Sequence, residues 1–328
     1  MQTIKHGEPS FKNICESVFT VKSRPRAKVS IVKGQDRKTN IREALSLIKR
    51  DIELPGKPIL LKPNFVSTSR SLAATHVDAI KAVMDFFLEL GAKSFLIGEA
   101  AAGHTWDGYR NFNYLELEKT YPVKLLDLNE DRWIKTKILN SRFNTSEVRV
   151  SKTVLDSYRI SVTRPKTHDF CIVTLALKNM AVGSLIGSDK WRIHQGYKAF
   201  NLNLVKLARL TSPHLSIIDG VVGMEGDGPV SGSEISSGFT VASANALACD
   251  LVTATLMGFD YKNIGYLWYG TKIGLGPENL DEIEVVGEKI ENCRIKFRPH
   301  YSYREQLNWR LEQWEDMLAR IMDDLANV

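Results

Sequence analysis

Short apolar runs and amphipathic stretches alternate along the first half of the chain. The runs that have the length and composition of buried strands are Ala27–Lys33, Pro58–Lys62, Ser94–Gly98 and Val123–Leu126. The stretches with apolar residues at helical spacing are Asn40–Ile52, a helix capped by Thr75 that runs to Leu90, and Asn113–Lys119. Strands that alternate with helices of about 10 to 15 residues are typical of parallel βαβ units.

The second half repeats this alternation less regularly. Its predicted strands are Tyr158–Thr163, Leu215–Ile218, Phe239–Ala242 and Glu282–Val286, and its predicted helices are Ala199–Leu210 and Asn245–Met257. We therefore predict an α/β fold, built mostly of parallel βαβ units in two lobes with a cleft between them.

The last 28 residues predict one amphipathic helix. Its apolar stripe has 4-3-4-3-4 spacing: Leu307, Leu311, Trp314, Leu318, Ile321 and Leu325. Such a stripe packs more often on its own domain than on a partner, although a helix-mediated homodimer stays open. The predicted organisation is thus a basic extension (1–26), an α/β region (27–299, with lobes 27–150 and 151–299) and a C-terminal helix (300–328).

Composition is that of a globular protein, with 43% hydrophobic and 25% charged residues. No run approaches the roughly 20 apolar residues of a membrane helix, and the N-terminus does not resemble a signal peptide. We therefore expect a cytoplasmic protein without a membrane partner. The four cysteines form no C-x-x-C pair, which argues against an iron–sulfur cluster and favours buried thiols.

Positive charge is concentrated at the N-terminus, where residues 1–50 carry 12 Lys and Arg against 4 Asp and Glu. A basic arm attracts nucleic acid or another anionic surface. No aromatic residues are interleaved for stacking on bases, so nucleic-acid binding is the weakest of our interpretations. A solvated face near an anionic substrate explains the charge equally well.

Two predicted strands end in polar residues. Lys62 and Asn64 follow one strand and suit a carboxylate or phosphate, because ligands of open α/β sheets bind beyond the carboxyl ends of strands. Glu99 and His104 follow the next strand and could act as acid and base or as metal ligands. The simpler alternatives are a Lys-Pro turn and a polar surface loop.

The densest group of candidate residues lies between Arg164 and Gly196. Lys166, His168 and His194 flank an apolar run that contains Lys178 and Asn179. A lysine within such a run destabilises the fold unless it is paired or functional. A desolvated amine can act as nucleophile or base, whereas an amphipathic helix could let Lys178 reach solvent.

A glycine-rich loop from Asp219 to Pro229 follows a later strand. Its spacing matches neither a dinucleotide-binding fingerprint nor a P-loop. Asp219 and Glu225 offer oxygen ligands for a divalent cation such as magnesium, and a flexible lid is the alternative. Asp250, in the helix that Asn245 starts, is interpreted as a capping or packing residue.

Together these motifs resemble the family called domain of unknown function 362, over roughly residues 27–290. The resemblance rests on Lys62-Pro63-Asn64, Gly98-Glu99, Pro165-Lys166-x-His168, Leu177-Lys178-Asn179-Met180 and the Asp219–Pro229 loop. Some members carry a ferredoxin-like segment, for which this chain lacks the cysteines.

The spacing of His168, Lys178 and His194 is also similar to that of nickel-pincer lactate racemase. This resemblance implies that Lys178 carries the pincer nucleotide, that His194 binds nickel, and that His104 and His168 exchange the substrate proton. The chain departs from that enzyme's Gly-Gly-Arg run, since Leu175-Ala176-Leu177 precedes Lys178, and it has Lys62 where the enzyme has an arginine.

We therefore expect an enzyme that acts on a small anionic carboxylate or phosphate, in isomerase or redox chemistry, with a divalent metal (nickel or magnesium) or a nickel-pincer nucleotide. We expect the catalytic residues to be His104, His168 and Lys178. The expected substrate-binding residues are Lys62, Asn64, Lys166 and Asn179, and the expected metal ligands are His194, Glu99, Asp219 and Glu225. The alternative is a non-catalytic protein that binds an anion or handles a cofactor.

Overall fold

A central sheet of eight strands organises the protein in this computed structural model, which describes residues 26–53 and 56–322. The strand order is β14-β1-β13-β10-β7-β2-β3-β4. The strands are β1 (Ala27–Lys33), β2 (Ile59–Lys62), β3 (Phe95–Glu99), β4 (Val123–Asp127), β7 (Tyr158–Thr163), β10 (Leu215–Gly220), β13 (Phe239–Ser243) and β14 (Ile283–Gly287). Strand β13 is antiparallel to both neighbours and the other pairs are parallel, which confirms the predicted α/β class.

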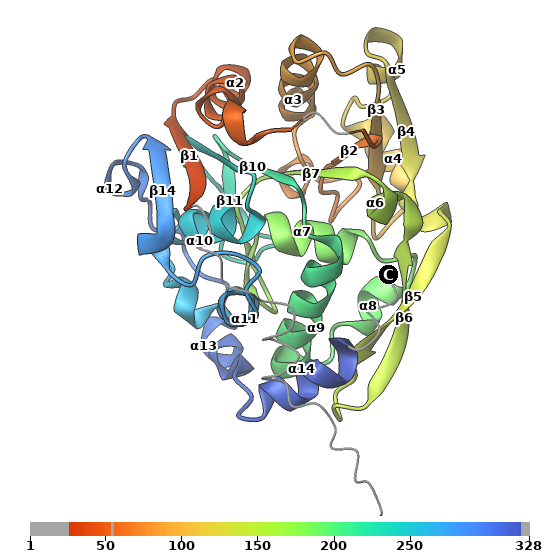
Figure 1. Cartoon of the computed structure of the whole chain (residues 1–328), viewed down its shortest axis with the longest axis vertical. Helices are drawn as coiled ribbons and strands as arrows, with labels where there is room; N and C mark the ends of the chain where they lie inside the picture. Colours follow the sequence, from red (N-terminus) through yellow and green to blue (C-terminus); the bar gives the residue numbers. More distant parts are fainter. Residues whose placement is uncertain (1–25, 54–55, 323–328) are drawn as a thin grey trace, which may run out of the picture.

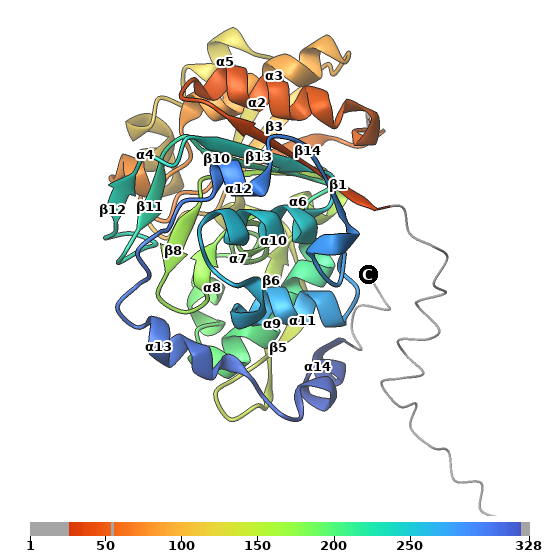
Figure 2. The same cartoon turned by 90° about the vertical axis from the view of Figure 1, so that its left-hand side faces the viewer.

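Helices cover both faces of this sheet (Figures 1 and 2). The larger ones are α2 (Arg37–Leu47) and α3 (Val77–Glu89) on one face, and α7 (Ala176–Gly183), α9 (Gly196–Thr211) and α10 (Ala246–Leu256) on the other. Alternation along each strand divides the core: Ile160 and Val162 of β7 pack with the residues of α2 and α3, whereas Ser161 bonds to the carbonyl of Ala176 at the start of α7.

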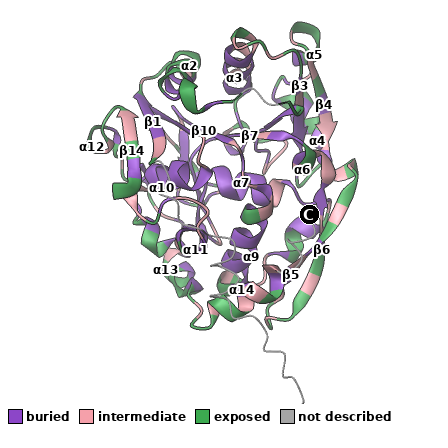
Figure 3. Ribbon diagram, in the orientation of Figure 1, coloured by how far each residue is buried: buried purple, intermediate pink, exposed green. Residues whose placement is uncertain are grey.

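Strands from both predicted lobes, 27–150 and 151–299, join in this one sheet, so the sheet is continuous across the boundary that we predicted at residue 150. The burial pattern in Figure 3 follows the same plan, because the central strands and α7 are buried while the outer helices expose one face. Deep burial on both faces explains why these strands read as continuous apolar runs.

Several smaller elements were not predicted. A second sheet has the order β12-β11-β8-β9, from Ser233–Ile235, Gly223–Glu225, Lys166–His168 and Ile172–Thr174, and a hairpin joins β5 (Trp133–Leu139) to β6 (Thr145–Ser151). The remaining helices are α4 (Thr105–Asn111), α5 (Leu117–Thr120), α6 (Lys152–Asp156), α8 (Asp189–Arg192), α11 (Gly265–Lys272), α12 (Ile290–Cys293), α13 (Tyr303–Gln306) and α14 (Trp314–Met322). The short 3₁₀ turns are Lys49–Asp51, Ser71–Ala73, Leu128–Glu130, Tyr261–Asn263, Leu280–Glu282 and Leu307–Trp309.

The prediction of one continuous C-terminal helix is wrong. The segment breaks between Trp309 and α14, where Arg310 is extended. Tertiary bonds replace the helical ones: Trp309 Nε1 donates to the carbonyl of Asn263 at 2.7 Å, and Leu311 N donates to the hydroxyl of Tyr269 at 3.1 Å. Leu318 is buried beside α9 residues of the same chain, and Leu325 lies outside the described residues.

The predicted cap of α3 is one residue out of place. The N-cap is His76, whose Nδ1 accepts from Asp78 N. Thr75 instead bonds across the fold, accepting from Asn64 N and donating to the carbonyl of Val162. A side chain with two long-range partners is therefore not free to cap the helix.

The described cysteines, Cys171, Cys249 and Cys293, are buried free thiols, as predicted, and Cys15 lies outside the described residues. No helix within residues 26–53 or 56–322 is long and apolar enough to cross a membrane. The basic extension is almost entirely outside the described residues, so its predicted role, like the cytoplasmic location and the homodimer, stays a prediction.

Asp250 of α10 caps the start of α7. Its two carboxyl oxygens accept from the backbone N–H groups of Ala176 and Leu177, each at 2.9 Å, which supplies the cap that Leu175 cannot provide. Burial of this carboxyl raises its pKa to about 8, against the lowering effect of the two N–H groups. The prediction of a capping role is thus confirmed by the contacts.

We predict that Asp250→Asn lowers the free energy of unfolding at pH 5 by about 1–3 kcal/mol, since the new amide N–H₂ meets a backbone N–H donor. Because the folded pKa lies above the unfolded value, the wild-type contribution is full below about pH 4 and is lost as pH rises toward 8. The difference in the free energy of unfolding between wild type and Asp250→Asn should therefore be smaller at pH 8 than at pH 5, as measured by urea titration. The matched control is Asp156→Asn, the same substitution at an exposed aspartate. A difference between wild type and Asp250→Asn that stays constant with pH would contradict the raised pKa.

Candidate functional site

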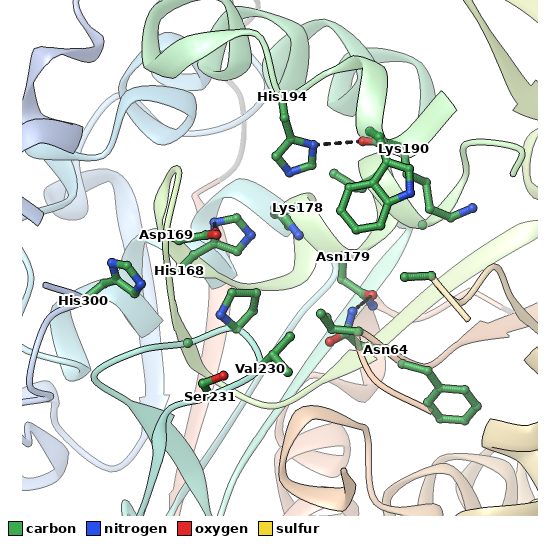
Figure 4. A pocket seen from close by; sticks show the side chains of 18 of the residues that line it. Asn64, His168, Asp169, Lys178, Asn179, Lys190, His194, Val230, Ser231 and His300 are labelled. Atoms are coloured by element: carbon green, nitrogen blue, oxygen red, sulfur yellow. Dashed lines mark hydrogen bonds and ion pairs between the residues drawn. The ribbon is translucent and has the colours of Figure 1, made fainter. Parts of the chain in front are cut away.

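A pocket of about 520 Å³ opens beyond the carboxyl ends of β2 and β3, against α7. Its polar lining includes Asn64, Glu99, His168, Lys178, His194 and His300. Lining residues come from both halves of the chain and from the segment after β14 (Figure 4). This position matches the expectation that ligands of open α/β sheets bind at this edge.

Lys178 projects from α7 into the pocket among His168, His194 and Asn179 (Figure 4). The residue is only 6% exposed, and among the described residues no hydrogen bond or ion pair engages its Nζ atom. Burial lowers the pKa of this amine, with Cys171 and Asp169 partly opposing the change. An unpaired, desolvated amine is a candidate nucleophile or base.

Three histidines surround this amine, and each has its Nδ1 occupied. Nδ1 of His168 lies 3.0 Å from both Phe170 N and Asp169 Oδ1, and Nδ1 of His300 lies 3.1 Å from Ser302 N. Among the described residues, no hydrogen bond engages Nε2 of either ring. Nδ1 of His194 instead donates to the carbonyl of Lys190 at 3.0 Å, which leaves Nε2 with a lone pair.

Burial favours the neutral form of two of these rings. It lowers the pKa of His168 well below 6.5, with Lys178 adding to the effect, and it lowers the pKa of His194 to about 4. The pocket therefore offers the neutral imidazoles of His168 and His194 at neutral pH.

The turn that carries His168 has a strained backbone and is held in place by hydrogen bonds. Ile172 has a positive φ of 68°, which is a costly conformation for a β-branched residue. Gln306 of α13 holds the turn, accepting from Ile172 N at 2.6 Å and donating to the carbonyl of His168 at 2.8 Å. The C-terminal segment thus positions this histidine as well as supplying His300.

Lys62 and Glu99 form an ion pair at the pocket wall, which Glu99 lines, and both side chains are almost fully buried. Lys62 Nζ also donates to the carbonyl of Pro63 at 2.8 Å. A Cβ atom at Gly183 would collide with the end of the Lys62 side chain, so glycine at that position lets α7 approach the pair. Burial lowers the pKa of Lys62 against the field of Glu99.

Lys166 belongs to a second buried network. Its Nζ donates to Asn64 Oδ1 and to the carbonyl of Ala73, and no carboxylate in the described residues pairs with it. Asn64 Nδ2 in turn donates to Asn179 Oδ1 at 3.0 Å. The two amides line the pocket while Lys166 lies behind them, so Lys166 supports the pocket wall and does not line the pocket itself.

The pattern of the family described as domain of unknown function (DUF362) matches residues 59–255. That range is more than half of the chain and includes the elements that carry Lys62, Glu99, Lys166 and Lys178.

The chain belongs to this family. It is also similar to a thylakoid-associated protein of Synechocystis sp., at 29% identity over 230 residues that make up 68% of this chain and 70% of that protein. A crystal structure of a Thermotoga maritima protein shares 12% identity and a TM-score of 0.41, over 59% of this chain and 52% of that one. The chain thus spans about half of that solved protein, and the likeness carries no conclusion about function.

Of the site residues that the sequence predicted in this DUF362 member, His168, Lys178, Asn64, Asn179, His194 and Glu99 line the pocket. His104 does not line the pocket, because it is the exposed N-cap residue of α4. The next residue, Thr105, is buried and donates to Asp127 Oδ1 at 2.8 Å.

The predicted metal ligands are dispersed. Glu99 pairs with Lys62, Asp219 with Arg37 and Glu225 with Arg298. No group of three or more His, Cys, Asp or Glu among the described residues could hold a metal ion. Oxygen donors that each hold a cationic side chain do not fit a magnesium site.

The pocket residues that were not singled out from the sequence include Asp169, Lys190, Trp191 and His300. Burial lowers the pKa of Lys190 to about 8. His300 lies more than 100 positions beyond His168 and His194, the other histidines of the pocket, and no local spacing signals that the chain returns to the pocket there.

We predict that Lys62→Met lowers the free energy of unfolding by about 3–5 kcal/mol, because it leaves the Glu99 carboxylate buried without its cation. Chemical denaturation measures the change. The matched control is Lys135→Met, which breaks the exposed pair of Lys135 with Glu147 and should cost about 0–1 kcal/mol. Equal costs for the two variants would show that the buried pair is not needed, and Lys62→Met with Glu99→Leu should recover much of the loss.

We also predict that Lys178 is labelled at lower pH than an exposed lysine. Its lowered pKa increases the neutral, reactive fraction of the amine below the usual titration range. Reductive methylation followed by peptide mass spectrometry across pH 6–10 gives the midpoint for each lysine. A free lysine side chain, with a pKa of about 10.4, supplies the reference midpoint, and a Lys178 midpoint equal to it would contradict the assignment.

Proposed function

We propose that this protein is an enzyme that acts on a small anionic carboxylate or phosphate in the pocket around Lys178. The unpaired, desolvated amine of Lys178, in one pocket with the neutral imidazoles of His168 and His194, carries the proposal. Three buried lysines, Lys62, Lys166 and Lys178, lie at or behind the pocket, and Glu99 is the one carboxylate that pairs with any of them among the described residues. An excess of basic groups favours an anionic ligand at the pocket.

Each side chain has a role in this proposal. Lys178 is the nucleophile or the base, His168 donates from Nε2 to an oxygen of the substrate, and His194 accepts a proton at Nε2. Asn64 and Asn179 orient the substrate through their amides. Gln306 is a positioning residue, since it holds the turn that carries His168.

A nickel-pincer nucleotide remains a specific form of this proposal. Lys178 and His194 line the same pocket, and both the amine and the Nε2 lone pair lack protein partners within the described residues. Lys178 would hold the nucleotide and His194 its metal, and the bound group would supply a hydride acceptor. The exposed position of His104 removes one of the two proton-transfer residues that the racemase resemblance implied.

Incubation with a set of small carboxylates and phosphates, followed by mass spectrometry of the products, tests the proposed activity. Lys178→Arg keeps a positive charge but loses the nucleophile, so turnover should fall by about 10²–10⁴-fold while ligand-induced stabilisation persists. Stabilisation of the wild type without any turnover would instead favour the non-catalytic, anion-binding alternative.

Intact mass and metal analysis of protein from its native source separates the two chemistries. An adduct mapped to Lys178 with stoichiometric nickel supports the pincer form, and an unmodified chain leaves direct amine chemistry.

A further inference from the structure

A row of buried polar side chains crosses the sheet on the face opposite the Lys178 pocket. Asp219 of β10 lies directly opposite Thr240 of β13. The parallel register of β10 with β7 pairs Ile218 with Thr163, so Asp219 lies beside Arg164 at the carboxyl ends of adjacent strands. Alternation along β7 and β10 directs Arg164 and Asp219 to the face covered by α2 and α3, where Val162 and Ile217 pack.

Each member of this row has a buried polar atom without a hydrogen-bond partner. These atoms are Arg164 Nε, Asp219 Oδ1 and Thr240 Oγ1. Only three other side-chain atoms in the described residues share that condition, so half of the unsatisfied atoms are on three neighbouring positions. Buried polar groups are almost always satisfied by protein, water or ligand, so we expect water or a ligand at this cluster.

The charge at the site is not balanced. Arg164 is 5% exposed, and among the described residues no hydrogen bond or ion pair engages its guanidinium. Asp219 Oδ2 accepts a hydrogen bond from Arg37 Nε at 2.5 Å. Glu234, whose field also reaches Arg164, is exposed and forms no ion pair with it. One cationic charge is therefore left over in a desolvated position.

Two helices begin at this place. Arg37 is the first residue of α2, and His76 caps α3. The first backbone N–H groups of a helix lack intrahelical acceptors and favour an anion. The Asp36 carboxylate already accepts from Thr39 N at the start of α2. Arg164, which is buried and has no partner among the described residues, is therefore the main anion-binding group at this place.

We propose that Arg164, Asp219 and Thr240 form a second ligand site, which binds a small monoanionic carboxylate at the start of α2. The carboxylate accepts from Arg164 in the planar geometry that guanidinium favours. Asp219 Oδ1 and Thr240 Oγ1 complete the site by bonding to a hydroxyl, amine or water on the ligand. A single surplus positive charge fits a monoanion better than a phosphate dianion.

The probe is acetate, exchanged for chloride at constant ionic strength, with binding followed by thermal shift and calorimetry. Arg164→Gln should weaken binding at this site by about tenfold or more, because a hydrogen bond to a charged group is lost. Thr240→Val, which replaces a buried hydroxyl by a methyl of similar shape, should keep the fold and weaken binding several-fold. Lys178→Met is the matched control, since it changes the other pocket and should leave this site unchanged.

A crystal grown in acetate provides the second measurement, independent of how the variants fold. Density for acetate between Arg164 Nε and the start of α2 supports the site, while an ordered water alone between the three orphaned atoms overturns it. Loss of acetate binding in Lys178→Met with full retention in Arg164→Gln also overturns it. Neither outcome depends on turnover at Lys178, so failure of this site and failure of the proposed enzyme are distinguishable.

Discussion

The cost of removing lysine amines from water shapes the carboxyl edge of the sheet. Lys62, Lys166 and Lys178 are all buried there, and an isolated ammonium in such surroundings is strongly destabilised. The three amines differ in the partners that compensate for their burial. Lys62 has the carboxylate of Glu99, Lys166 has two oxygen acceptors without charge, and Lys178 has neither. This difference in compensation is the reason that we propose Lys178 as the reactive amine.

The central strands could be predicted from the sequence because they are buried on both faces and are therefore continuous apolar runs. Ala27–Lys33 and Tyr158–Thr163 agree residue for residue with β1 and β7. The β5–β6 hairpin was missed since its strands alternate polar and apolar residues and half of each is solvated. The prediction of one continuous C-terminal helix failed for another reason. Trp309 donates to the carbonyl of Asn263, and this contact with a distant part of the chain outweighs the local helix propensity.

The candidate site was predictable where its residues follow strands or share α7. Asn64 and Glu99 end neighbouring parallel strands, so their meeting follows from the βαβ order. His104 is only five positions beyond Glu99, yet the loop turns it outward as α4 begins. His300 and Gln306 come from the segment after the last strand, and only the tertiary fold brings them to the turn at His168. Residues that are close in sequence are therefore not always close in the pocket, and residues far apart in sequence can meet there.

A single strand end links the two faces of the sheet. Arg164 lies on the α2 side, and Lys166, two residues later, bonds to Asn64 in the wall of the other pocket. Burial lowers the pKa of Lys166 well below its usual value, and the charge of Arg164 contributes to that shift. An anion on Arg164 would oppose that charge and so favour the protonated form of Lys166. The positive field at the Lys178 pocket would then depend on occupancy of the opposite face, through electrostatics alone and without movement of the rigid sheet between them.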